Sequence, residues 1–133
     1  MNYGHGYRAP RKQSKYHNIK GGGFDSQKEK MRYQELLLLQ KAGKIADLER
    51  QVEFQLTPTV RGPETVGPRG GRKQGKVLLK GCSYVADFVY TDMETGEYVI
   101  EDVKGYKGGE AYRIFMLKKK FFYRIYGILI REV

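Results

Sequence analysis

Cysteine and histidine are scarce in this chain, acidic residues are fewer than basic ones, and there is no long hydrophobic run. The single cysteine, Cys82, excludes an intrachain disulfide framework and a cysteine-rich zinc site. His5 and His17 have no partners at metal-binding spacing. No run approaches the ~18 apolar residues that span a bilayer, and the N-terminus has no apolar signal-peptide core. We therefore expect an intracellular, soluble protein without a membrane partner.

Basic residues dominate the charge of the sequence. Its 133 residues include 25 Lys and Arg against 15 Asp and Glu, which gives a formal net charge of +10 at pH 7. Such an excess predicts an acidic partner, with nucleic acid as the first candidate. The length fits one domain with a short appendage. We place a basic flexible arm at residues 1–22 and the domain at residues 23–133.

Two segments concentrate positive charge and lack a core-forming pattern. Residues 1–20 hold five basic residues and no acid, and residues 57–76 hold five basic residues against Glu64. We predict that both contact a phosphate backbone, the second as a flexible loop. The alternatives are a solvated tail for the first segment and plain disorder for the second. The proposed contact residues are Arg8, Arg11, Lys12, Lys15, Arg69, Arg72 and Lys73.

Two helices are indicated by capping and periodicity. Ser26 and Glu29 form a capping box that begins a helix ending near Ala42. Its apolar surface, including residues 36–39, predicts a largely covered core helix. Apolar residues recur every three or four positions over residues 110–126, which predicts a second helix with a core-facing stripe. The stripe consists of Ile114, Leu117, Phe121 and Ile125, and the exposed flank beside it presents Lys118 and Lys119 to nucleic acid.

Residues 83–105 have the pattern of a β-hairpin, because two runs rich in Val, Ile, Tyr and Phe flank a turn-rich segment. Side chains alternate along a strand, so Asp102 and Lys104 share one face while Glu101 and Val103 take the other. We expect Glu101 at the surface or paired with a lysine. Asp87 adds a carboxylate on the first strand, among apolar neighbours that make an unpaired charge costly.

Asp87, Asp102 and Lys104 have the chemistry of a magnesium site. Mg²⁺ prefers hard oxygen ligands, usually one or two carboxylates, and keeps several waters. A lysine on the same face can position the attacking water or offset charge on a phosphate. Asp102-Val103-Lys104 is the only acid-x-Lys tripeptide in the chain. It lies on the second strand of a hairpin whose first strand carries an acid, as in the metal-binding core of the PD-(D/E)XK nucleases.

The predicted elements follow one another in the order αβββαβ, with a polar turn at residues 44–49 and strands at 51–56, 83–90, 98–104 and 128–133. This order predicts a compact α/β (α+β) domain with a central mixed sheet flanked by helices. It is also the order of the restriction-endonuclease-like core of the PD-(D/E)XK superfamily. Over about residues 15–125 the chain resembles the small phage-borne family called domain of unknown function 1064. The blocks that carry the resemblance are KYHN, FDSQKEKMRYQELLLLQKAGKIADLERQVEFQL, YVADFVY and VIEDVKG.

The resemblance implies the residues of a nuclease site. Asp87 and Asp102 become the metal-binding carboxylates for Mg²⁺, with Mn²⁺ as a substitute, and Lys104 becomes the catalytic lysine. The backbone carbonyl of Val103 is a further ligand. Ala86 departs from the family pattern, which usually has proline before the first aspartate. The first helix supplies one more acid, and the two candidates are Glu29 and Glu35.

The leading hypothesis is therefore an Mg²⁺-dependent endonuclease that hydrolyses DNA phosphodiester bonds in the cytoplasm of a phage-infected or prophage-carrying bacterium. The resemblance makes branched, Holliday-junction-like DNA a target and a two-fold homodimer a working form. The rival is a non-catalytic nucleic-acid-binding protein in which Asp87, Asp102 and Lys104 form a satisfied salt-bridge cluster. A phage structural or assembly protein is a third hypothesis, but it leaves the acids unexplained.

Overall fold

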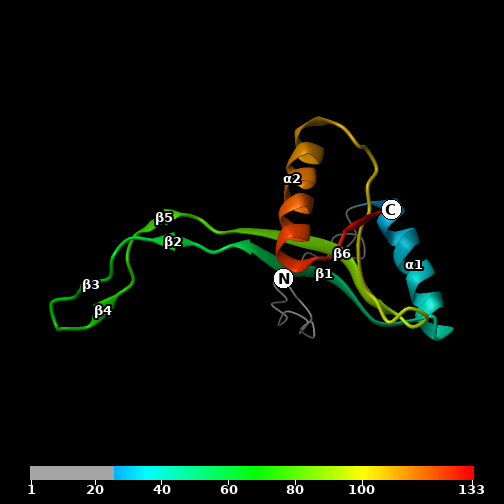
Figure 1. Ribbon diagram of the computed structural model, residues 1–133, viewed down its shortest axis with the longest axis horizontal. Coiled ribbons are helices and arrows are strands. Elements are labelled where there is room, and N and C mark those ends of the chain that lie inside the picture. The colour runs from blue at the N-terminus through cyan, green and yellow to red at the C-terminus, as the bar shows by residue number, and fades with distance from the viewer. Residues whose placement is uncertain (1–25) are drawn as a thin grey trace.

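The computed structural model describes residues 26–133, so the predicted N-terminal arm and its contact residues Arg8, Arg11, Lys12 and Lys15 lie outside the described part. The two helices are α1 (Gln27–Lys41) and α2 (Gly109–Tyr126), and they pack on a central sheet (Figure 1). Neither helix within residues 26–133 is long and apolar enough to cross a bilayer.

The sheet has four strands in the order β1, β6, β7, β8. Their bounds are Ile45–Thr57, Cys82–Asp92, Tyr98–Asp102 and Arg131–Glu132. The predicted hairpin is confirmed, since β6 and β7 pair antiparallel. β1 pairs antiparallel with β6, whereas β8 runs parallel to β7, so the sheet is mixed. Residues 26–133 thus form an α+β structure with a central mixed sheet and two helices.

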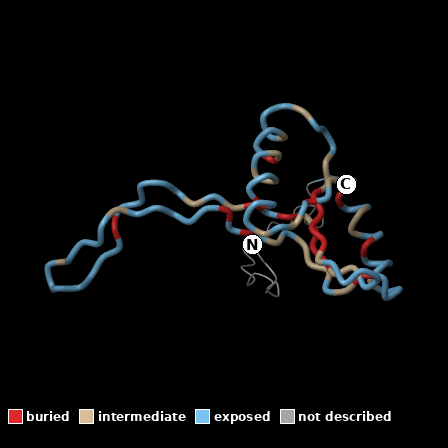
Figure 2. The backbone as a smooth tube through the Cα atoms, in the orientation of Figure 1, coloured by how far each residue is buried: buried red, intermediate tan, exposed pale blue. Residues whose placement is uncertain are grey.

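Between β1 and β6 the chain leaves the sheet as a long two-stranded extension, here called the ribbon (residues 58–81). Figures 1 and 2 show it projecting from the body with its surface exposed. It contains β2 (Val60–Arg61) paired with β5 (Val77–Leu79), and β3 (Thr65–Val66) paired with β4 (Arg72–Lys73). Through these two short ladders the backbone of the ribbon is partly paired, whereas the sequence predicts a loop without strands for this segment.

The predicted boundaries of α1 are confirmed, but its predicted role as a core helix is wrong. The Ser26 hydroxyl accepts a hydrogen bond from the Glu29 backbone N–H at 3.1 Å, and Gly43 follows the helix with φ of 76°. Only Glu29 and Leu36 are buried, whereas the side chain of Leu38 is 68% exposed and Leu39 is also exposed. A run of four consecutive leucines covers every side of a helix, and only one side of α1 meets the sheet.

The predicted position of α2 is also confirmed, although the face that it buries is not the predicted one. The buried residues are Phe115 and Phe122. The predicted core-facing stripe of Ile114, Leu117, Phe121 and Ile125 is exposed. Periodicity identifies an apolar stripe but does not distinguish two apolar faces of one helix, and here the aromatic face packs on the sheet.

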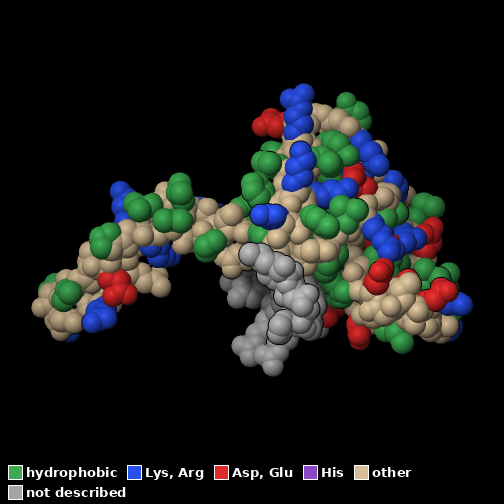
Figure 3. Space-filling view, viewed as in Figure 1, with side chains coloured by type: hydrophobic (Ala, Val, Ile, Leu, Met, Phe, Trp, Pro, Cys, Tyr) green, Lys and Arg blue, Asp and Glu red, His purple; other side chains and the backbone are tan. Residues whose placement is uncertain are grey.

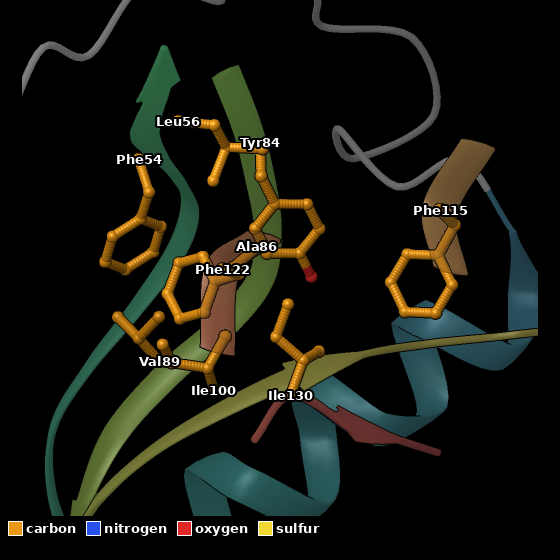
Figure 4. Packing of buried hydrophobic residues seen from close by; sticks show 9 residues of the cluster. All are labelled: Phe54, Leu56, Tyr84, Ala86, Val89, Ile100, Phe115, Phe122 and Ile130. Atoms are coloured by element: carbon orange, nitrogen blue, oxygen red, sulfur yellow. The ribbon is translucent and has the colours of Figure 1, made fainter. Parts of the chain in front are cut away.

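Two apolar clusters lie on the two faces of the sheet. In the first, the rings of Phe54 and Phe122 meet edge to face with centroids 5.0 Å apart (Figure 4). The second packs Leu36 of α1 against the opposite face. Ile100 belongs to the first cluster and its neighbour Val99 to the second, as alternation requires when both faces are covered. α1 and α2 therefore cover opposite faces.

Candidate functional site

The regular alternation of β6 breaks at Asp87. Ala86 packs in the cluster on the α2 side, whereas Phe88 packs in the cluster on the α1 side. Residues two apart on a regular strand share a face, so the strand changes face at the residue between them. Opposite, Gln51 on β1 has φ of 51°, a left-handed conformation that is rare for residues other than glycine. The predicted turn at residues 44–49 is wrong as well, because these residues begin β1.

This irregularity brings Asp87 to Glu29, the acid in the first turn of α1. The Gln51 side-chain amide donates to Glu29 Oε1 at 3.2 Å and to Asp87 Oδ1 at 3.3 Å. The other carboxylate oxygen of Asp87 accepts the backbone N–H of Val103 at 2.7 Å. Glu29 is buried, with 3% of its surface exposed. Residues from α1, β1 and β6 thus meet at the side-chain amide of Gln51.

Asp102 and Lys104 lie on the same face, as the alternation predicts. The Lys104 ammonium is 2.7 Å from Asp102 Oδ1, and the Tyr84 hydroxyl donates to Asp102 Oδ2 at 2.7 Å. The same ammonium lies 3.6 Å from the centroid of the Phe115 ring, where the π electrons attract it. Lys28 on α1 donates to the Lys104 carbonyl at 2.6 Å, which links the helix to the chain two residues beyond the end of β7.

Burial and the charges of neighbouring acids perturb the pKa of Asp87. Burial, reinforced by the charges of Asp102 and Glu29 and opposed by the hydrogen bonds from Val103 and Gln51, raises the pKa of Asp87 to about 6. Burial also raises the pKa of the Tyr84 hydroxyl, and the nearby charges of Asp102 and Asp87 reinforce the rise. Tyr84 therefore remains a hydrogen-bond donor at neutral pH. The negative charges of Asp102 and Glu29 both act on Asp87, and Lys104 forms an ion pair with Asp102.

The donor chemistry suits a hard cation, although the oxygens are occupied by protein donors. Within residues 26–133, no three His, Cys, Asp or Glu side chains stand close enough together to hold a metal ion. Two of the nearby donors are side-chain groups that can rotate, the Gln51 amide and the Lys104 ammonium. Carboxylate oxygens are the ligands that Mg²⁺ prefers. The residue types fit Mg²⁺, and binding would require those donors to move.

The structure separates the two helix acids. Glu35 lies at the surface, where its side chain is 60% exposed and pairs with Arg32 at 2.9 Å. Glu29 is the one that lies beside Gln51 and Asp87. The predicted carbonyl ligand, Val103, contacts Asp87 through its N–H, and the role of its carbonyl stays a prediction.

The predicted nucleic-acid contacts within residues 26–133 fall into two groups. Arg69, Arg72 and Lys73 are exposed on the ribbon, where Arg72 approaches Glu64 at 3.9 Å. On α2, Lys118 is half-buried, and Lys119 pairs with Glu132 at 2.7 Å. The predicted exposed lysine flank is therefore partly engaged inside the protein.

Glu101 occupies the face predicted for it, but the expected surface position and lysine partner are both wrong. It is 1% exposed and accepts two hydrogen bonds from the Arg32 guanidinium, at 2.6 and 2.9 Å. The Tyr90 hydroxyl donates to it at 2.6 Å. Hydrogen bonding to Glu101 raises the pKa of Arg32, and burial together with Glu101 raises that of Tyr90 to about 12. The Glu101 carboxylate can be buried here because α1, which covers this face of the sheet, supplies the Arg32 guanidinium as its cationic partner.

Three residues of the region were not found from the sequence: Gln51, Tyr84 and Arg32. Arg32 carried a usable signal, since it lies three positions after Glu29 and therefore on the same side of α1. Tyr84 lies on the strand of Asp87, but its partner Asp102 could not be identified before the register was known. Gln51 carried no signal, because its position depends on a left-handed backbone that glutamine rarely adopts.

The family described as Protein of unknown function (DUF1064) matches the chain over residues 7–131. No curated protein matches the chain, and no solved structure does.

Proposed function

Because the chain belongs to the family described as Protein of unknown function (DUF1064), we propose for it the function that its acidic cluster supports best, metal-dependent endonucleolytic hydrolysis of DNA. The observation that carries this proposal is the meeting of Glu29 and Asp87 at the Gln51 amide. Asp102 lies near enough to contribute to the raised pKa of Asp87. An acid whose pKa is perturbed beside other acids is typical of functional sites, although structural networks also perturb pKa values.

Mg²⁺, with Mn²⁺ as a substitute, would be held by Asp87, Asp102 and Glu29, whose carboxylates would have to move closer together to share one ion. When bound, such a cation lowers the pKa of water and offsets negative charge on a phosphate. A half-turn of the Gln51 amide would present its oxygen in place of its nitrogen, which is the hard ligand type that the ion prefers. The carbonyl of Val103 is a further candidate ligand.

Lys104 is proposed as the catalytic lysine. Its ammonium, which contacts the carboxylate of Asp102 and the ring of Phe115, places a positive charge just beyond the end of β7 and would turn toward the phosphate when a cation binds Asp102. A preorganised cation of this kind stabilises the charge that builds on a phosphate during bond cleavage. Tyr84 acts through another residue, because its hydroxyl fixes the orientation of the Asp102 carboxylate.

Two further features support a nuclease of the PD-(D/E)XK superfamily. With the ribbon set aside, the elements follow as one helix, three strands, one helix and one strand, which is the order of that core. Basic side chains are abundant on the described surface, as Figure 3 illustrates for one face. DNA is the proposed partner because sequence-independent phosphate contacts require such charge. Branched DNA and a two-fold homodimer belong to the same proposal.

A second candidate function, non-catalytic binding of nucleic acid, is favoured by the state of Asp102. Its two carboxylate oxygens have protein partners, Lys104 on one and Tyr84 on the other. A carboxylate satisfied in this way needs no cation. The two functions differ in their response to Mg²⁺, since a satisfied salt-bridge cluster gains nothing from the ion.

A cleavage assay with three substrates tests the proposal. A four-way junction, a linear duplex and a single strand are incubated with the full chain in Mg²⁺, in Mn²⁺ and in chelator. The nuclease proposal predicts cleavage of at least one substrate in Mg²⁺ or Mn²⁺ and none in chelator. Binding of all three without cleavage under any condition would replace it with the second candidate function.

A further inference from the structure

The ribbon has no core of its own. Among residues 58–81 only Gly75 is buried, and every arginine, lysine and aliphatic side chain of the segment is exposed. Figure 2 shows the contrast between the exposed ribbon and the buried strands of the body. An isolated two-stranded ribbon is marginally stable in water. A ribbon of this length without packing is therefore expected to gain stability from a partner.

The charge of the ribbon indicates what kind of partner it suits. Six basic residues stand against one acid, which gives this short segment a net charge of +5. The acid, Glu64, approaches Arg72 only at 3.9 Å, and both side chains are mostly exposed. The positive charge is thus left almost uncompensated within the ribbon. The basic residues are Arg61, Arg69, Arg72, Lys73, Lys76 and Lys80.

The ribbon is also thin. A Cβ atom on Gly75 would lie 1.9 Å from the carbonyl oxygen of Gly62, so the two strands touch at a point where no side chain fits. The Gly62 N–H donates to the Lys76 carbonyl at 2.8 Å beside this contact. Backbones of paired strands are about 4.8 Å apart, and a two-stranded ribbon fits the major groove of B-DNA, which is about 12 Å wide.

We propose that the ribbon docks in the major groove of double-stranded DNA next to the proposed cleavage site; the inference rests on the proposed function for its choice of DNA. Arginine and lysine side chains along both strands contact the phosphates that line the groove. The exposed apolar pair Val60 and Leu79, opposite each other on β2 and β5, faces a groove that presents thymine methyl groups.

The length of the ribbon sets the length of duplex that it needs. About twelve residues separate the end of β1 from Arg69 in the turn at the tip, so at about 3.3 Å per residue the ribbon reaches at most about 40 Å beyond the sheet. One turn of B-DNA is about 34–36 Å long. The protein should therefore contact about one helical turn of duplex to one side of the body, and a single strand offers no groove to it.

The test compares two charge-matched variants of the full chain. One carries Arg69→Gln, Arg72→Gln and Lys73→Gln on the ribbon. The control carries Lys30→Gln, Lys41→Gln and Lys44→Gln, which removes the same charge from exposed positions on α1 and the turn that follows it. Fluorescence anisotropy measures binding to a duplex of about 30 base pairs, a duplex of about 10 base pairs and a single strand of about 30 nucleotides, lengths chosen around one helical turn. All titrations contain chelator, so the outcome does not depend on cleavage.

The ribbon variant should lose roughly ten- to a hundredfold in affinity for the long duplex near 0.1 M salt. Its salt slope should fall by up to about 2.7, since each phosphate contact contributes about 0.9. The short duplex and the single strand should be affected much less, and the control should bind the long duplex nearly as the parent does. Equal losses in the two variants, or equal losses on duplex and single strand, would overturn the inference. So would a ribbon variant whose mass in light scattering is half that of the parent, because the ribbon would then join two copies of the chain.

Discussion

The Asp87 carboxylate accepts the backbone N–H of Val103 at 2.7 Å, just beyond the point where the β6–β7 ladder ends. This bond uses one oxygen of Asp87 to satisfy a strand end, while the other oxygen lies beside the Gln51 amide. Asp87 thus forms a hydrogen bond at the end of the β6–β7 ladder and also lies beside Glu29 through the shared Gln51 amide. An asparagine in its place would keep an oxygen for the Val103 N–H and would remove the charge.

Asp87→Asn should stabilise the metal-free protein at neutral pH. The folded-state pKa of Asp87 is raised to about 6 from a usual value of 3.8, so the folded protein holds the proton more tightly than the unfolded chain does. The parent therefore loses stability as pH rises from about 4 to about 6, by an amount on the order of 2 kcal/mol. The variant lacks this loss and should exceed the parent at pH 7 while equalling it near pH 4.

Chemical unfolding at several pH values in chelator measures this difference. Asp47 provides the exposed control, because Asp47→Asn removes a carboxylate from an exposed position on β1, where asparagine tolerates the positive φ. A gap between Asp87→Asn and the parent that does not change with pH would show that burial and repulsion do not perturb this acid.

Arg32→Met should destabilise the fold by about 3 kcal/mol, because it leaves the Glu101 carboxylate buried without its cation. The control is Glu35→Gln, which breaks the exposed half of the same arginine's contacts and should cost less than about 1 kcal/mol. Urea unfolding of both variants gives the comparison. Equal stability of the two would mean that Glu101 finds another partner or takes up a proton.

Local patterns predicted the boundaries of the two helices and the β6–β7 hairpin, but not the start of β1 or the short strands of the ribbon. The Ser26 hydroxyl cap and the glycine at position 43 delimit α1, and both act through hydrogen bonds between residues a few positions apart. The hairpin was also predictable, because alternation and turn residues specify it locally. On β7, alternation placed Asp102 and Lys104 on one face and Glu101 on the other.

Features that depend on tertiary contacts could not be predicted from the sequence. The change of face at Asp87 and the left-handed Gln51 arise where two strands deviate together, and no local propensity favours them. The burial of Glu101 depends on Arg32, a residue 69 positions away. The buried face of α2 was misassigned because the helix carries two apolar faces, and only the packing of Phe122 against Phe54 selects between them.

Lys104→Ala should reduce cleavage by roughly a hundredfold or more, since a preorganised cation contributes on this scale to phosphate chemistry. Binding of Mg²⁺ should persist because the carboxylates remain. Lys107→Ala serves as the control, since the side chain of this neighbouring lysine is 58% exposed and its ammonium lies 4.0 Å from Glu132. Single-turnover cleavage and metal titration of both variants make the comparison. Parental cleavage by Lys104→Ala would remove this lysine from the proposed site.

The central claim is that the acids at the end of the β6–β7 hairpin support metal-dependent cleavage of DNA, and Asp102→Asn tests it most directly. The amide keeps an oxygen for the Tyr84 hydroxyl and removes the charge that would hold the cation. In single-turnover assays with Mg²⁺ or Mn²⁺, the parent should cut DNA, whereas Asp102→Asn should cut none and still bind the same DNA. Cleavage by Asp102→Asn at the parental rate, or a parent that cuts no substrate with either metal, would contradict the account.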